Sequence, residues 1–196
     1  MSPDLPDLLA RRAELTPGAV ALEEIATGRS LRYAELDERA GRAATVLDAR
    51  GVGAGDRVAI LCRNRIAFFE ALFACARLGA ILVPLNWRMP AAELDPLLAH
   101  AGIRLLLHGA EDRPTVSRLA APPPALDLDG GYEALVEAAL PLARRRDWPA
   151  DGIWYLLYTS GTTGRPKGVI YTYRMALANL VNIGTAIGLG ASDTTL

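Results

Sequence analysis

The feature that most constrains the fold is an alternation of short apolar runs and amphipathic stretches between residues 56 and 108. The run Val58-Ala59-Ile60-Leu61 contains no polar residue, which is typical of a strand in a parallel sheet covered on both faces. The longer stretches carry apolar residues at helical spacing, and a glycine follows each of them. The predicted order is strand, helix, strand, helix, strand over residues 56–62, 66–78, 80–85, 91–101 and 103–108. We therefore expect an α/β fold with a mainly parallel sheet layered with helices.

The segments on either side are predicted from the same patterns. Before the alternation, the sequence predicts a short helix, a hairpin and a longer helix that Gly51 caps, over residues 5–15, 20–33 and from 34. After it, a triple-proline connector leads into a strand (125–128), a helix (132–140) and a loop (141–152). Two strands (153–158 and 169–172) and a last helix (173–187) are predicted to follow. Within the helix over residues 66–78, the side chains expected to face the core are Phe69, Leu72, Phe73 and Ala76.

The apolar strand over residues 153–158 runs directly into a polar stretch that indicates a phosphate-binding loop. Hydroxyl side chains supply short hydrogen-bond donors, and glycines let the backbone curl so that successive N–H groups point at one anion. One lysine at the end of the stretch adds a compact cation. The residues predicted to bind phosphate are Thr159, Ser160, Gly161, Thr162, Thr163, Gly164 and Lys167.

Composition strengthens the prediction for the lysine. Of the 21 lysine and arginine residues in the chain, all except Lys167 are arginine. A slim ammonium can reach phosphate oxygens where a forked guanidinium does not fit, although a bias in composition could leave one lysine there by chance. The stretch is not the Walker A pattern of P-loop hydrolases, because Pro166 precedes the lysine and Gly168 follows it.

Charge and cysteine content exclude several classes of function. The net charge of −1 gives no reason to expect nucleic acid as a partner, and Asp147 follows the run Arg144-Arg145-Arg146 at once. Cys62 and Cys75 are the only cysteines, and they have no histidine or cysteine at metal-ligand spacing, so we expect buried reduced thiols and no metal site. His100 and His108 are expected to be surface or capping residues.

No segment of the sequence is predicted to cross a membrane. The N-terminal stretch lacks the basic and apolar regions of a secretory signal. Residues 66–85 are apolar, but Glu70 and Arg77 fall inside the stretch and Gly79 and Pro84 interrupt it. A buried helix followed by a strand explains the stretch better, and we expect a cytoplasmic protein.

The residues from Thr159 to Gly168 match Thr-Ser-Gly-Thr-Thr-Gly-x-Pro-Lys-Gly at every position, and this resembles the signature of the adenylate-forming superfamily. Acyl-CoA synthetases, luciferases and the adenylation domains of peptide synthetases belong to that superfamily. Less specific similarity extends over nearly the whole chain, for example at residues 31–36 and 51–58. By this resemblance the chain is the N-terminal portion, residues 1–196, of an AMP-binding domain that lacks the rest of the large domain and the C-terminal domain.

Two further positions refine the resemblance. Peptide-synthetase domains usually carry Asp-Pro where this chain has Asn86-Trp87, so the segment is more similar to acyl-CoA synthetases and points to a carboxylic acid, fatty or related. Many members have a Thr-His pair after the loop, whereas Thr172 is followed here by Tyr173. If that position lines the acyl pocket, as the resemblance implies, the bound acid differs in shape or polarity.

The resemblance implies that ATP and magnesium activate the acid to an acyl-adenylate and that coenzyme A then takes the acyl group. The seven loop residues would contact the phosphates, and no catalytic residue lies in this portion, because the family's catalytic lysine is in the missing C-terminal portion of the same enzyme. Two alternatives stay open: the chain could be a non-catalytic binding module, or the final acyl acceptor could differ from coenzyme A. A third reading, a P-loop hydrolase, is disfavoured by the Pro-Lys-Gly ending.

Overall fold

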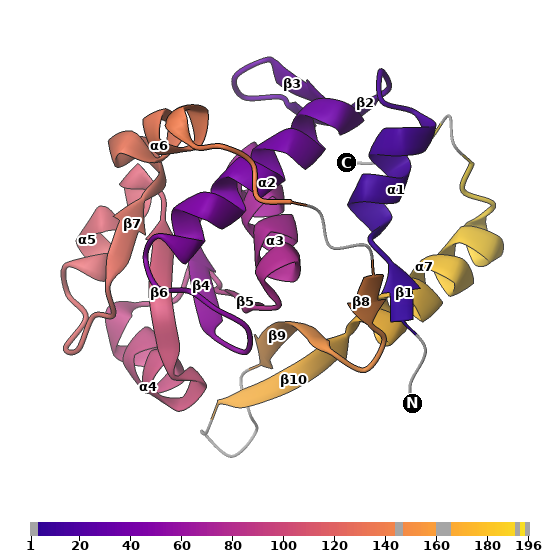
Figure 1. The fold of residues 1–196 in the computed structure, drawn as a ribbon. Helices are drawn as coiled ribbons and strands as arrows, with labels where there is room; N and C mark the ends of the chain where they lie inside the picture. The colour runs from indigo at the N-terminus through magenta and orange to yellow at the C-terminus, as the bar shows by residue number, and fades with distance from the viewer. Residues whose placement is uncertain (1–3, 144–146, 160–165, 191–192, 195–196) are drawn as a thin grey trace.

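The computed structural model describes residues 4–143, 147–159, 166–190 and 193–194. Its centre is a six-stranded sheet with the strand order β10-β9-β5-β4-β6-β7 (Figure 1). All neighbouring strands pair in parallel except β10, which pairs with β9 in the antiparallel direction. The strands are β4 (Arg57–Leu61), β5 (Ile81–Pro84), β6 (Ile103–His108), β7 (Ala125–Asp127), β9 (Ile153–Thr159) and β10 (Lys167–Thr172). The predicted α/β fold with a mainly parallel sheet is confirmed.

Helices cover both faces of this sheet. On one face α2 (Tyr33–Asp48), α3 (Ile66–Leu78) and α6 (Glu133–Ala138) pack against Val58 and Ile60 of β4. On the other face α4 (Ala91–Ala101) and α5 (Arg113–Val116) pack against Ala59 and Leu61 (Figure 1). Because successive side chains of a strand point to opposite faces, the unbroken apolar run of β4 is buried on both sides.

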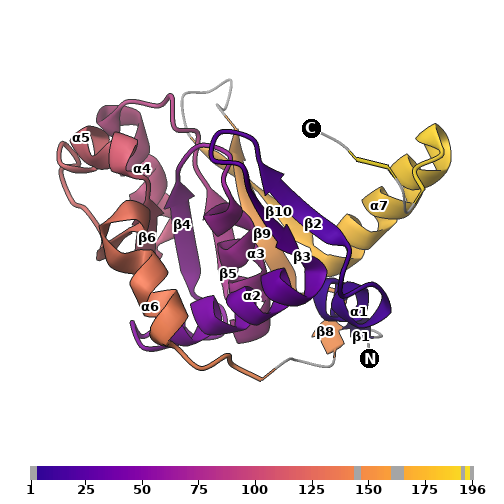
Figure 2. The same cartoon turned by 90° about the horizontal axis from the view of Figure 1, so that it is seen from above.

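Smaller elements surround the central layers. Strand β1 (Asp4–Pro6) pairs with β8 (Asp147–Pro149), and α1 (Leu8–Leu15) follows β1. The predicted hairpin is β2 (Val20–Glu24) with β3 (Arg29–Arg32). Two short segments flank α5 and β7: the 3-10 turn η1 (Ala110–Asp112) and the kinked π-type segment η2 (Leu128–Tyr132). The last helix is α7 (Tyr173–Ile187), which projects from the body of the molecule (Figure 2).

Four predicted elements have the expected bounds, and two glycines end their helices as predicted. Helices α3, α4 and α7 and strand β6 begin and end at the predicted residues. Gly79 and Gly102 have φ values of 71° and 60°, a left-handed conformation that an L side chain adopts only with strain. The predicted buried helix and strand over residues 66–85 are α3 and β5. Among the described residues, no helix combines the length and the apolar character that a membrane crossing needs.

Several details of the prediction are wrong. Phe69 is 36% exposed, because α3 lies between the sheet and α2 and buries its small residues, such as Ala71 and Ala74, instead. The predicted loop 141–152 contains β8, because β1 pairs with it and Trp148 of β8 packs against Trp154. The first helix starts at Leu8 rather than Leu5, because the Asp7 carboxylate accepts a hydrogen bond from the Ala10 backbone N–H and caps it. The predicted helix 132–140 is shorter, ending at Ala138.

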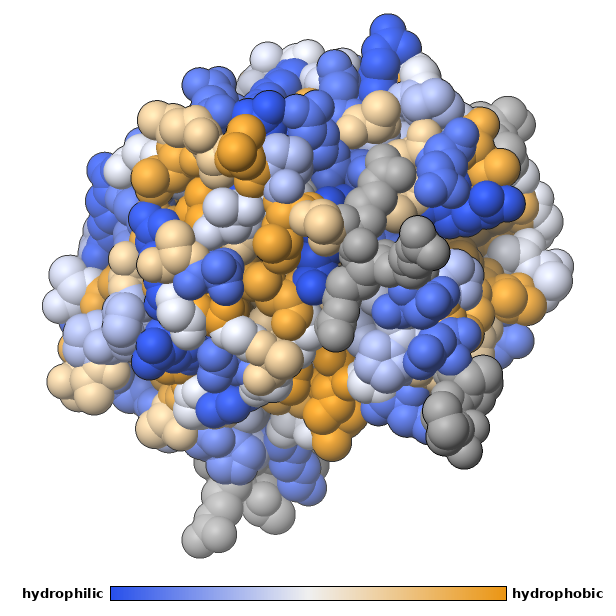
Figure 3. Space-filling view, in the orientation of Figure 1, coloured by the Kyte–Doolittle hydropathy of each residue, from blue (hydrophilic) through white to orange (hydrophobic). Residues whose placement is uncertain are grey.

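The apolar side of α7 has little cover within the described part of the chain. Only Tyr173 of this helix is buried. Large exposed apolar residues on the helix are Met175, Leu180, Val181, Ile183 and Ile187. Figure 3 shows apolar surface on the side of the molecule where α7 lies.

Candidate functional site

The structure brings the first and last predicted phosphate-binding residues together. Thr159 is the C-terminal residue of β9 and Lys167 is the first residue of β10, and the two are directly paired in the antiparallel ladder. Both are exposed. The other predicted residues, Ser160, Gly161, Thr162, Thr163 and Gly164, lie outside the described residues. The predicted second strand is confirmed, because the next described element after β9 is β10, where a Walker A sequence would lead into a helix.

The Lys167 ammonium is available for an anion. Among the described residues, no carboxylate lies within ion-pair distance of it, whereas arginines such as Arg29, Arg39 and Arg65 are paired. An exposed ammonium without a carboxylate partner can bind a phosphate without first breaking an ion pair. The Thr159 side chain beside it adds a hydroxyl that can donate to the same anion.

The strands place this hairpin next to a topological switch point. From β4 the chain leaves towards α3 on one face of the sheet, whereas from the neighbouring β5 it leaves towards α4 on the other face. In open α/β sheets, the diverging connections open a crevice at the carboxyl ends of two such strands, and ligands bind there. Strand β9 lies beside β5 and runs parallel to it, so Thr159 also ends a strand at its carboxyl end.

The loops that leave β4 and β5 carry a basic and aromatic cluster, formed by Arg63, Trp87 and Arg88. The Cζ atoms of Arg63 and Arg88 lie 4.3 Å and 4.1 Å from the centroid of the Trp87 ring. Arg63 also forms an ion pair with Glu111, at 3.0 Å, whereas no carboxylate among the described residues pairs with Arg88. The sequence reasoning missed this cluster, although its members can be found as the polar residues that follow two consecutive buried strands.

A neighbouring ion pair ties the loop after β4 to the end of β7. Arg65 donates to both carboxylate oxygens of Asp129, at 2.7 Å and 2.9 Å. This bidentate contact lowers the pKa of Asp129 to about 2. Asp129 also accepts a hydrogen bond from the Ala110 backbone N–H, at 2.8 Å, so the pair braces the carboxyl end of the sheet.

The cysteines and histidines lie apart from the predicted phosphate-binding residues in sequence. Cys62 and Cys75 are both buried, as predicted, and burial raises the pKa of each thiol to about 12. The described residues contain no group of three or more His, Cys, Asp and Glu side chains that could bind a metal ion. His100 is exposed on the last turn of α4, as predicted. The prediction of a surface position is wrong for His108, because it ends β6, an inner strand of the sheet; the side chain is buried and contacts the Gly109 carbonyl at 3.0 Å.

Tyr173 lies in a buried aromatic cluster. It is 4% exposed, and its ring centroid lies 4.8 Å from that of Trp148 and 5.5 Å from that of Trp154. Trp148 comes from β8 and Trp154 from β9. The side chain therefore packs where β9 meets the start of α7.

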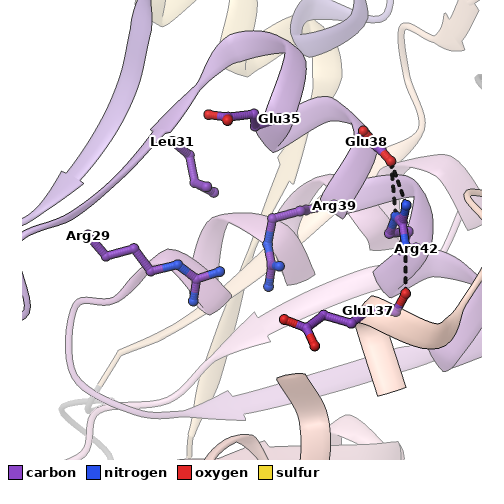
Figure 4. A pocket seen from close by; sticks show the side chains of 7 residues that line it. All are labelled: Arg29, Leu31, Glu35, Glu38, Arg39, Arg42 and Glu137. Carbon is purple, nitrogen blue, oxygen red and sulfur yellow. Dashed lines mark hydrogen bonds and ion pairs between the residues drawn. The ribbon is translucent and has the colours of Figure 1, made fainter. Parts of the chain in front are cut away.

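A depression away from the β9–β10 hairpin is formed by ion-paired side chains and is not the predicted ligand site. It lies between β3, α2 and α6 and is lined by Arg29, Leu31, Glu35, Glu38, Arg39, Arg42 and Glu137 (Figure 4). Its arginines are already paired: Arg39 with Glu70 at 2.5 Å, Arg29 with Glu133 at 3.0 Å, and Arg42 with Glu38 at 2.6 Å. Paired arginines of this kind stabilise the contact between α2, α3 and α6, and they leave no net charge for a ligand.

Taken together, the antiparallel pair β9–β10 at the edge of a mainly parallel sheet agrees with the fold expected for the N-terminal part of an adenylate-forming domain. The sequence profile of the AMP-binding enzyme family matches residues 9–196. The chain belongs to this family.

Similar proteins agree with the family assignment. The chain is 40% identical over 190 residues to a feruloyl-CoA synthase of Amycolatopsis sp, covering 95% of this chain and 37% of that protein. It is 37% identical over 174 residues to the long-chain-fatty-acid–CoA ligase FadD13 of Mycobacterium tuberculosis, covering 85% and 34%. The chain thus spans about a third of the length of these relatives.

A solved structure also superposes on the chain. The o-succinylbenzoate coenzyme A synthetase of Bacillus subtilis in complex with AMP has a TM-score of 0.84 and 31% identity, covering 97% of this chain and 48% of that one. The same enzyme in complex with ATP and a magnesium ion has a TM-score of 0.82 and 29% identity, covering 97% and 50%.

Proposed function

We propose that this chain supplies the phosphate-binding part of an acid–thiol ligase, which activates a carboxylic acid with ATP and passes the acyl group to coenzyme A. The observation that carries the proposal is the pairing of Lys167, the only lysine of the chain, with Thr159 at the two ends of the loop. The proposed phosphate-binding set is that of the sequence analysis: Thr159, Ser160, Gly161, Thr162, Thr163, Gly164 and Lys167.

The chemistry of the first step requires such a loop. The acid's carboxylate attacks the α-phosphate of ATP, an acyl-adenylate forms, and negative charge builds on the departing pyrophosphate. Hydroxyl and N–H donors held in place before the reaction stabilise this charge, as does a lysine ammonium. Removing one such donor typically costs on the order of 3 kcal/mol in the transition state.

Magnesium fits this proposal as an ion that arrives with ATP. No carboxylate cage for a metal exists among the described residues, and the loop offers hydroxyl oxygens. Magnesium in nucleotide sites is commonly held by the substrate phosphates and one or two protein oxygens. When bound, the ion would neutralise part of the phosphate charge.

The cluster of Arg63, Trp87 and Arg88 supports a second anion-binding position in the same ligase. Coenzyme A carries phosphate groups of its own, and a guanidinium binds phosphate through two parallel hydrogen bonds. Arg88 has no carboxylate partner among the described residues and sits in the loop at the switch point. We assign this cluster to phosphate groups of the nucleotide or of coenzyme A.

The remaining parts of the proposal follow from the family. The acid is fatty or aromatic, the protein works in the cytoplasm, and the rest of the adenylating enzyme supplies the adenine pocket and the catalytic lysine. A non-catalytic binding module is the second candidate, and ATP–pyrophosphate exchange that does not depend on Lys167 would favour it. Ligation to an acyl acceptor other than coenzyme A is the third, and a comparison of thioester formation with coenzyme A and with other thiols distinguishes it.

The test is substitution of Lys167 in the chain joined to the rest of its enzyme. Lys167→Ala is expected to lower ATP–pyrophosphate exchange by about a hundredfold or more, with little change in the urea midpoint of unfolding. Lys167→Arg should recover only part of the activity. Arg118→Ala, which removes an exposed cation after α5, is the matched control and should keep the parent rate. Unchanged exchange in Lys167→Ala would refute the proposed role.

A further inference from the structure

The C-terminal end of β9 lies beyond its backbone pairing with β5 in the central sheet, so side-chain contacts are needed to fix its position. The parallel ladder between β5 and β9 pairs Leu82 with Tyr155. Tyr158 is three residues further on, about 10 Å along an extended strand. At that point β10 is the strand partner of β9 among the described residues, so the hairpin that carries the loop needs another contact to fix its direction.

Tyr158 supplies that contact on one side of the hairpin. It is paired with Gly168, directly next to the pair of Thr159 and Lys167. A Cβ atom on Gly168 would lie 3.3 Å from the Tyr158 Cζ atom, so the ring covers the backbone of Gly168 closely. Because side chains alternate along a strand, Tyr158 points to one face of the hairpin, whereas Thr159 and Lys167 point to the other.

His100 connects Tyr158 to the helical layer. The Tyr158 hydroxyl lies 2.8 Å from Nδ1 of His100, and the two rings meet edge to face with centroids 5.9 Å apart. Burial raises the pKa of Tyr158 and the charge of Arg57 acts in the opposite direction, so the hydroxyl is protonated at neutral pH. The hydroxyl donates to Nδ1 when the imidazole carries its proton on Nε2. The same face of β9 packs against the buried cluster that includes Leu94 and Leu97 of α4.

We propose that His100 and Tyr158 are positioning residues, which set the direction of Thr159 and Lys167 at the two ends of the phosphate-binding loop. The inference rests on the proposed function and adds to it two residues outside the signature's polar stretch. Holding the Tyr158 ring against α4 fixes the rung of the ladder next to the loop. That rung in turn orients the Lys167 side chain on the opposite face, towards the phosphates of a bound nucleotide.

The test uses three substitutions that leave the buried core intact. Tyr158→Phe keeps the ring over Gly168 and removes only the hydroxyl. His100→Leu removes the partner, and His100→Asn keeps a polar atom near the position of Nδ1. NMR titration of the chain with magnesium-ATP should show affinity weakened about fivefold in Tyr158→Phe and in His100→Leu, the factor that one hydrogen bond contributes. The double variant should be no weaker than either, and His100→Asn should restore most of the affinity.

The free chain provides a second readout. Without nucleotide, Tyr158→Phe and His100→Leu should change the backbone amide signals of Thr159 and Lys167, and His100→Asn should bring them back towards the parent values. The urea midpoints of all variants should stay close to that of the parent, because the contact is at the surface. Parent-like amide signals together with parent-like affinity in Tyr158→Phe would overturn the positioning role.

Lys167→Ala separates this inference from the proposed function. If Lys167→Ala binds magnesium-ATP as the parent does, the phosphate-binding role itself fails. If Lys167→Ala loses binding while Tyr158→Phe and His100→Leu keep it and keep the parent amide signals, only the positioning role fails.

Discussion

Removing Arg39 should destabilise the chain strongly, because it leaves Glu70 buried without a cation. Glu70 is 1% exposed, and it accepts hydrogen bonds from Arg39 Nε at 2.5 Å and from the Tyr132 hydroxyl at 2.9 Å. Arg39 also donates to Glu133 at 2.7 Å. These contacts join α2 to α3, η2 and α6.

Breaking a buried ion pair by removing one partner costs about 3–5 kcal/mol, since the remaining charge has lost its compensation. Arg39→Leu should therefore lower the free energy of unfolding by about 3 kcal/mol or more. In urea, with a slope of about 2 kcal/mol per molar, the midpoint should fall by about 1.5 M or more. The measurement is equilibrium unfolding at pH 7, followed by far-UV circular dichroism.

Two further variants test the reasoning. Arg39→Leu combined with Glu70→Leu removes both charges and should be more stable than Arg39→Leu alone. Arg11→Leu breaks a surface pair with Glu14, in which both side chains are more than half exposed, and should cost less than about 1 kcal/mol. If Arg39→Leu costs no more than Arg11→Leu, the network does not stabilise the fold as argued.

Two other predictions concern pH and activity. The pKa of Asp129 is lowered to about 2 from 3.8, so its ion pair with Arg65 stabilises the fold fully above about pH 4 and is lost as pH falls through 2. Allowing for solvent screening of a side chain that is 35% exposed, Asp129→Asn should cost about 1 kcal/mol at pH 7 and almost nothing at pH 2, as measured by urea unfolding at both values. An equal cost at both pH values would contradict this. The chain of residues 1–196 by itself should show little or no ATP–pyrophosphate exchange, and activity should return when the rest of the enzyme is joined or co-expressed. Robust exchange by residues 1–196 that Lys167→Ala abolishes would contradict this prediction.

The local pattern of the sequence was sufficient for the α/β fold. Apolar runs such as the one in β4 can be satisfied only by burial on both faces, and glycines at positions 79 and 102 end helices for a local conformational reason. The phosphate-binding loop was also predicted from local sequence, because its hydroxyls, glycines and lysine are consecutive in the chain. Both predictions use local patterns of residue type, which the order of residues encodes directly.

The other features depend on residues far apart in the chain, and only the tertiary structure decided them. Phe69 is exposed because α3 packs its small residues against two layers, and β8 exists because β1 lies beside it. The cluster of Arg63, Trp87 and Arg88 forms where β4 and β5 end side by side. His100 reaches Tyr158 across 58 positions of sequence. Spacing along the chain carries no information on such contacts, because the sheet order and the helix packing that create them arise only when the whole chain has folded.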